Sequence, residues 1–127
     1  MLLASIAFAQ TPPQKPPDPQ GTPQLPPDED AVTAPKEYVF NPVQSKREVE
    51  VGLQYFHKGN FKAAANRFTE ATKWNDGNAE AWLRLAEAEE KEKNVKGERE
   101  ALAKYLQLAP EAKNAAELKK KLAKLGG

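Results

Sequence analysis

The side chains that most often carry out chemistry are scarce in this sequence. The chain has no Cys and a single His, His57, and beyond its apolar first nine residues the only Ser is Ser45. The absence of Cys excludes disulfides, thiol catalysis, thiolate metal sites and a lipid anchor on Cys. Because a nucleophile, a base and an orienting acid cannot be assembled from this set, we expect a protein that is not an enzyme and holds no cofactor or metal. We interpret His57 as a polar residue facing the dipole at a helix end.

An acidic run on a predicted third helix invites a metal or acid–base interpretation. The run contains four glutamates, Glu87, Glu89, Glu90 and Glu92. Arg84, Lys91 and Lys93 lie among them at spacings that form ion pairs along a helix. We therefore interpret the run as a solvated helix face.

The charge of the chain argues against nucleic-acid binding. The formal net charge is +1 and both signs are interspersed, so the surface has no field that would gather nucleic acid.

The distribution of proline indicates the fold class. Of the 11 prolines, all but Pro110 lie at or before Pro42. Because the stretch between these two has no helix breaker of this kind and is rich in good helix formers, we expect an all-α domain over residues 37–127.

The first nine residues are almost wholly apolar and end in small residues at Ala7 and Ala9, as the cleavage site of a secretory signal requires. No Lys or Arg precedes them, which a start codon further upstream would explain. We expect export to the periplasm or cell envelope; the alternative is an apolar N-terminus on a cytoplasmic protein. The segment is too short to cross a membrane, which takes about 20 apolar residues.

Residues 10–36 are rich in proline and poor in apolar side chains. Such a composition cannot offset the entropy lost on ordering, so we expect a disordered linker with polyproline-II character. Its proline pairs suit either a spacer or a ligand for an aromatic-lined groove, and we favour the spacer.

Local signals divide the rest of the chain into helices. Asn41 followed by Pro42 predicts a helix start, and we expect this helix to run to about His57. Gly59 and Asn60 end it, a second helix follows over 61–74, and 75–77 closes that helix. A shift of 34 residues places similar residues on one another, Asn60 on Asn94 and Phe68 on Leu102 among them.

These units resemble the tetratricopeptide repeat. In the first, the signature positions are filled by Gly52, Tyr55, Gly59, Phe61, Ala64, Phe68 and Ala71. In the second they are filled by Trp82, Leu85, Ala86 and Pro110, whereas Glu89, Glu98 and Tyr105 depart from the pattern. The resemblance implies an α-solenoid of antiparallel helical hairpins, with repeats at about 45–78 and 79–112. The departures weaken the expected packing of the second repeat.

A last helix is expected over about 114–125, with the side chain of Asn114 capping its start, and it covers the open end of the stack. Leu118, Leu122 and Leu125 form its apolar side. Its other side is rich in lysine, which suits either a solvated cap or contact with an acidic partner or an anionic lipid surface.

The resemblance also implies where a partner binds, because the first helix of each hairpin in this family lines a groove that takes a peptide or helix of a protein partner. By repeat position, the groove residues are Val49, Leu53, Phe56, Leu83, Glu87 and Glu90. They form an apolar patch beside an acidic one, suited to an amphipathic or basic segment. The alternative is that they pack against residues 38–40. Binding of a C-terminal carboxylate is not implied, since Val49 and Leu53 replace the residues it requires.

Two functions are consistent with this pattern. The first is a non-enzymatic adaptor or scaffold in a bacterial cell envelope, and the second is a structural protein that self-associates into a homo-oligomer without a separate ligand. Residues 55–68 are also similar to the tetratricopeptide lipoprotein of the outer-membrane β-barrel assembly machine, which indicates a compartment only.

Overall fold

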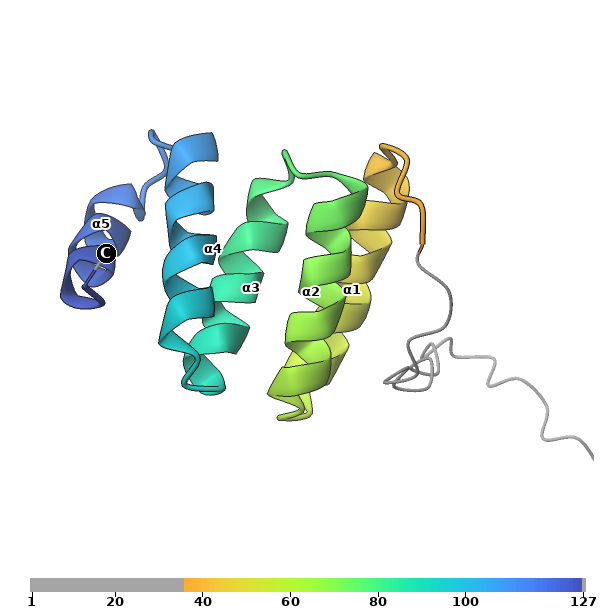
Figure 1. Ribbon diagram of the computed structural model, residues 1–127, viewed down its shortest axis with the longest axis horizontal. Helices are drawn as coiled ribbons and strands as arrows, with labels where there is room; N and C mark the ends of the chain where they lie inside the picture. The colour runs from red at the N-terminus through yellow and green to blue at the C-terminus, as the bar shows by residue number, and fades with distance from the viewer. Residues whose placement is uncertain (1–35, 127) are drawn as a thin grey trace, which may run out of the picture.

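The computed structural model describes residues 36–126, and over this range the chain is entirely helical with irregular connections. The five helices are α1 (Pro42–His57), α2 (Phe61–Trp74), α3 (Ala79–Lys91), α4 (Val95–Leu108) and α5 (Ala115–Lys124). They follow one another in a row, with α1 and α2 at one end and α5 at the other (Figure 1). The predicted all-α solenoid of helical hairpins is confirmed. The signal-like segment 1–9, and the linker 10–36 except Lys36, lie outside the described residues.

Asparagine side chains fix where the first four helices begin. The side-chain oxygen of Asn41 accepts a hydrogen bond from the backbone N–H of Gln44 at 3.0 Å. Asn60, Asn78 and Asn94 cap their helices in the same way, at 3.2 Å each. Because each cap satisfies a backbone donor that the first turn leaves unpaired, it sets the helix start locally.

One short turn joins the two helices of each hairpin, and each of these turns contains a residue in the left-handed region. Gly59, with φ of 80°, lies between α1 and α2. Its counterpart one repeat later is Lys93, with φ of 60°, between α3 and α4. A side chain makes this conformation costly, so Lys93 occupies a position that favours glycine.

The core is built on small residues that let neighbouring helices approach closely. Phe68 of α2 is fully buried and lies against Gly52 of α1. A Cβ atom on Gly52 would lie 2.5 Å from Cε1 of Phe68. Ala64 and Ala71 of α2 are fully buried as well. The first hairpin is therefore packed tightly around one aromatic ring.

Ser45, in the first turn of α1, joins the ends of three helices. Its hydroxyl is fully buried on α1 and donates to the backbone oxygen of Ala71 on α2 at 2.7 Å. The same hydroxyl accepts from Nδ2 of Asn78 at 2.9 Å, while Oδ1 of Asn78 caps α3. These bonds fix the start of the second hairpin against the first.

Consecutive helices pack on one another along the row, and α1 also contacts α3 directly. This contact places the first helices of the two hairpins next to each other. No helix within residues 36–126 is long and apolar enough to span a bilayer.

Candidate functional site

The first half of the predicted groove lies on α1. Leu53 and Phe56 are partly buried and pack against the core, which leaves part of each side chain at the surface. The ring of Phe56 stands edge-on to that of Phe61, with 5.0 Å between ring centroids. Val49 is different, because it is a core residue with 3% of its surface exposed. On this helix, the surface open to a partner therefore belongs to Leu53 and Phe56.

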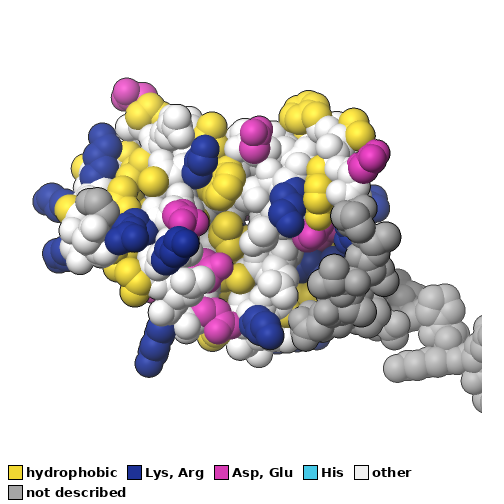
Figure 2. Space-filling model, viewed as in Figure 1, with side chains coloured by type: hydrophobic (Ala, Val, Ile, Leu, Met, Phe, Trp, Pro, Cys, Tyr) yellow, Lys and Arg dark blue, Asp and Glu magenta, His cyan; other side chains and the backbone are white. Residues whose placement is uncertain are grey.

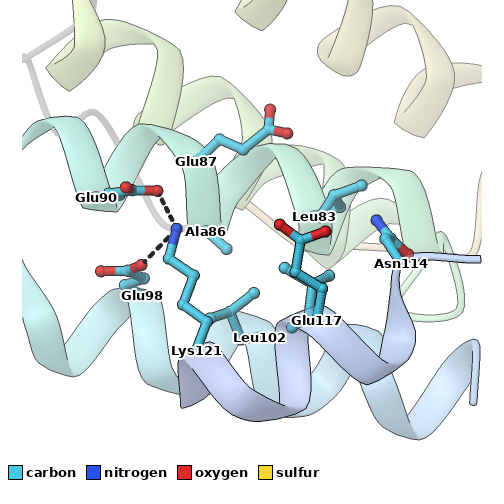
Figure 3. Close-up of a pocket in the computed structure, with 10 residues that line it drawn as sticks. Leu83, Ala86, Glu87, Glu90, Glu98, Leu102, Asn114, Glu117 and Lys121 are labelled. Atoms are coloured by element: carbon cyan, nitrogen blue, oxygen red, sulfur yellow. Dashed lines mark hydrogen bonds and ion pairs between the residues drawn. The ribbon is translucent and has the colours of Figure 1, made fainter. Parts of the chain in front are cut away.

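The second half of the predicted groove lines a cavity of about 260 Å³. Leu83, Glu87 and Glu90 of α3 form one wall, and residues of α4 and α5 form the others (Figure 3). The α5 residues among them include Glu117, Leu118 and Lys121, with Asn114 just before the helix. The helix that the sequence predicts as a cap thus lines the site as well.

Lys121 links α5 to both other walls of this cavity. Its ammonium donates a hydrogen bond to Oε2 of Glu90 on α3 and lies 3.4 Å from Oε1 of Glu98 on α4 (Figure 3). Burial alone would lower the pKa of Lys121, but the hydrogen bond to Glu90 and the negative charges of Glu90 and Glu98 together raise it above its usual value. Lys121 therefore stays charged at neutral pH and holds α5 in place.

Glu98 is the least expected residue of the site. It occupies the repeat position that Ala64 fills in the first hairpin, where the side chain is fully buried. Glu98 is itself 4% exposed. Its carboxylate is accommodated because α5 brings the ammonium of Lys121 next to it. The sequence marks Glu98 as a departure from the repeat but does not reveal this partner.

The other two departures also have specific contacts. The hydroxyl of Tyr105 donates to Oδ1 of Asn114 at 2.9 Å. Asn114 precedes α5 but makes no capping bond with it, so its predicted capping role is wrong. Glu89 accepts from Nδ2 of Asn94 at 2.8 Å in the turn between α3 and α4. Polar contacts thus replace the small and aromatic residues of the repeat pattern.

Arg99 of α4 holds the far end of α5. Its Nη1 donates to the backbone oxygens of Leu125 and Gly126 at 3.5 and 3.3 Å. A cation beside the last carbonyls of a helix is favourable because these carbonyls have no partner within the helix. Both ends of α5 are therefore tied to α4.

The segment before α1 packs on α2. The ring of Tyr38 lies edge-on to that of Trp74 at 5.0 Å, and its hydroxyl donates to Glu70 at 2.8 Å. Burial raises the pKa of the Tyr38 phenol to about 12. The hydrogen bond to Glu70 and the negative charges of Glu70 and Glu48 add to this effect. The hydrogen bond and ring contacts of Tyr38 are thus with α2, and the alternative in which residues 38–40 cover the groove residues stays a prediction.

Ser45 and His57, the two residues that the sequence offered for catalysis, both lie where the fold explains them. The hydroxyl of Ser45 is buried between helices, as described above. His57 lies exposed in the last turn of α1, as predicted. No group of three or more potential metal ligands lies together within residues 36–126. The predicted groove residues themselves are apolar and acidic side chains.

These features define a class of protein, an α-solenoid of antiparallel helical hairpins. Residues 55–125 match a model of the tetratricopeptide repeat, and the chain belongs to this family. A comparison with curated proteins found no match. Because tetratricopeptide repeats generally mediate protein–protein interactions, the family assignment supports an interaction module.

Proposed function

We propose that this protein is a non-enzymatic adaptor that binds a peptide or helix of another protein across α1 and α3. The observation that carries the proposal is the position of Phe56 and Leu53. Both side chains stay partly exposed on the first helix, although the core next to them is closely packed. Apolar side chains of this kind beside an acidic cavity suit the apolar and basic sides of an amphipathic segment.

We further propose that the adaptor works in the cell envelope. The apolar segment 1–9 with its small residues at Ala7 and Ala9, followed by a proline-rich linker, supports this compartment. N-terminal sequencing of the mature protein, expressed together with its upstream DNA, tests export. A mature chain that starts near Gln10 supports export, and one that starts at Met1 contradicts it.

The runner-up is a scaffold that associates with itself, and exposed apolar side chains before and at the start of α1 favour it. Val39 and Phe40 are each 72% exposed, and Val43 is 71% exposed. Contiguous exposed apolar patches often mark contacts with other proteins. In a homo-oligomer, this patch would be covered by a second copy.

Photo-crosslinking in the native cell distinguishes the two functions. A photoreactive residue at position 56 is expected to give adducts with a different protein if the chain is an adaptor. Adducts only with a second copy would favour the scaffold. In a second experiment the photoreactive residue is placed at position 53. If the chain is an adaptor, Phe56→Glu should then abolish the adduct with the other protein without changing the sedimentation of the free chain.

Val43→Glu is the matched control, because it adds the same charge to the same helix at an exposed position. In the adaptor it should leave partner capture intact. In the scaffold it should change the oligomer size. If neither substitution changes capture or size, the binding surface has been assigned wrongly.

A further inference from the structure

The cavity between α3, α4 and α5 is strongly acidic. Four carboxylates line it, those of Glu87, Glu90, Glu98 and Glu117, against the single ammonium of Lys121, a formal charge of −3. Glu87 is paired with Arg84 at 3.1 Å, but Arg84 does not line the cavity. Glu117 forms no ion pair with any described residue, and its carboxylate points from α5 toward α3 (Figure 3).

Glu98 supplies an independent observation that points to a further cation. Its side chain is 5% exposed, and its Oε1 is buried without a hydrogen bond from any described residue. The ammonium of Lys121 lies 3.4 Å from this oxygen, close enough for an ion pair but without the geometry of a hydrogen bond. Buried carboxylate oxygens normally accept hydrogen bonds, so this one has capacity for another donor.

The rest of the wall is apolar. Leu83, Ala86, Leu102 and Leu118 line the cavity between the carboxylates. A volume of about 260 Å³ is smaller than the roughly 300–1,000 Å³ of pockets that hold small molecules, so it suits a single side chain. Arginine and lysine combine an aliphatic stem with a charged head, which matches an apolar wall that carries carboxylates. Arginine fits better, because its planar head can pair with two oxygens at once.

Lysine and arginine side chains dominate the surface beside this cavity. They gather over α5, while acidic side chains lie nearer the middle of the same face (Figure 2). Lys119, Lys120 and Lys124 of α5 are exposed. Like charges around the mouth repel a partner that is basic all over, so the cavity selects a segment with one basic side chain among apolar ones.

We propose that this cavity takes one arginine or lysine side chain of the partner's segment, with its head among the carboxylates of Glu98 and Glu117. The proposal rests on the function proposed above and names its specificity. It makes α5 part of the binding surface, so that groove recognition combines apolar contact on α1 with charge recognition between α3 and α5.

Fluorescence anisotropy on the full chain tests the proposal with two labelled amphipathic peptides. One is a helix of Leu, Ala and Gln with a single central Arg, and the other has citrulline in its place, which keeps the shape and removes the charge. We expect the Arg peptide to bind about tenfold more tightly, which corresponds to about 1.4 kcal/mol. Raising the salt concentration should reduce the difference.

Glu98→Gln and Glu117→Gln should each remove most of the preference for the Arg peptide. Glu111→Gln is the matched control, because Glu111 is exposed and lies outside the cavity. Circular dichroism verifies the folding of each variant, and Glu117 provides a variant whose exposed side chain does not support the core.

Equal binding of the two peptides overturns the cavity proposal and leaves the adaptor function intact. The same holds for an Arg preference that survives in both cavity variants. If neither peptide binds, the cavity proposal also fails, whereas the crosslinks from position 56 decide the adaptor function separately.

Discussion

Replacing Gly52 with alanine separates two effects that act in opposite directions on stability. Alanine is favoured over glycine in a helix interior by about 1 kcal/mol, so helix propensity alone predicts a more stable protein. Packing predicts the opposite, because the added Cβ would lie 2.5 and 2.6 Å from two ring carbons of Phe68. That ring is fully buried, so it cannot move aside into solvent. Overpacking of this kind typically costs about 1–3 kcal/mol.

We expect packing to dominate, since the clash involves a buried ring and not the end of a flexible side chain. Taking the upper half of the overpacking range and subtracting the propensity gain leaves a net loss of about 1–2 kcal/mol. For a domain of this size, each kcal/mol lowers the melting temperature by about 4–8 °C. Urea and thermal unfolding followed by circular dichroism measure both quantities.

A double-mutant cycle identifies the cause. Phe68→Leu shortens the side chain that the new methyl group meets, so Gly52→Ala should cost less in that background than in the wild type. Asn66→Ala is the control on an exposed position of α2, and it should stabilise the helix slightly. A Gly52→Ala variant as stable as the wild type, or more so, would refute the close approach of α1 and α2.

Two further predictions concern single residues. Lys93→Gly should raise the free energy of unfolding by about 0.5–1 kcal/mol, because glycine adopts the left-handed region without the side-chain penalty; a loss of stability in urea unfolding would contradict the assigned backbone. Burial and Glu70 raise the pKa of Tyr38 to about 12, so the phenol contributes stability that is present below pH 10 and lost between about pH 10 and 12. Spectroscopic titration of the phenolates should show a step near pH 12 that Tyr38→Phe removes, and a step near pH 12 that this substitution leaves unchanged, or no such step, would contradict the assignment.

The sequence predicts the helix boundaries well because the signals for them are local. Asn41 with Pro42, and Gly59 with Asn60, act through the backbone of their own turns, and the first two helices begin and end where these residues predict. The left-handed conformation of Lys93 follows from the repeat shift onto Gly59, but its side chain hides the signal.

The site is less accessible to sequence reasoning, because its properties depend on how the helices pack. Repeat position places Val49 on the groove, whereas the packing of the first hairpin buries it in the core. Glu98 departs from the repeat pattern, but only the structure shows that α5 brings Lys121 beside it. Asparagine is a common capping residue, but the side-chain oxygen of Asn114 accepts a hydrogen bond from the hydroxyl of Tyr105 instead. Contacts between distant segments decide each of these cases.

The attachment of Tyr38 to α2 determines how mechanical load enters the domain. The chain is fastened at Tyr38 to Glu70 and Trp74, and the backbone N–H of Asn41 donates to the oxygen of Trp74 at 2.9 Å. Tension on the chain before residue 36 is therefore carried by the C-terminal end of α2, and not by the first turn of α1. These contacts must break before a force applied at residue 36 can pull α1 away from α2, so they protect the packing of α1 against tension from that side.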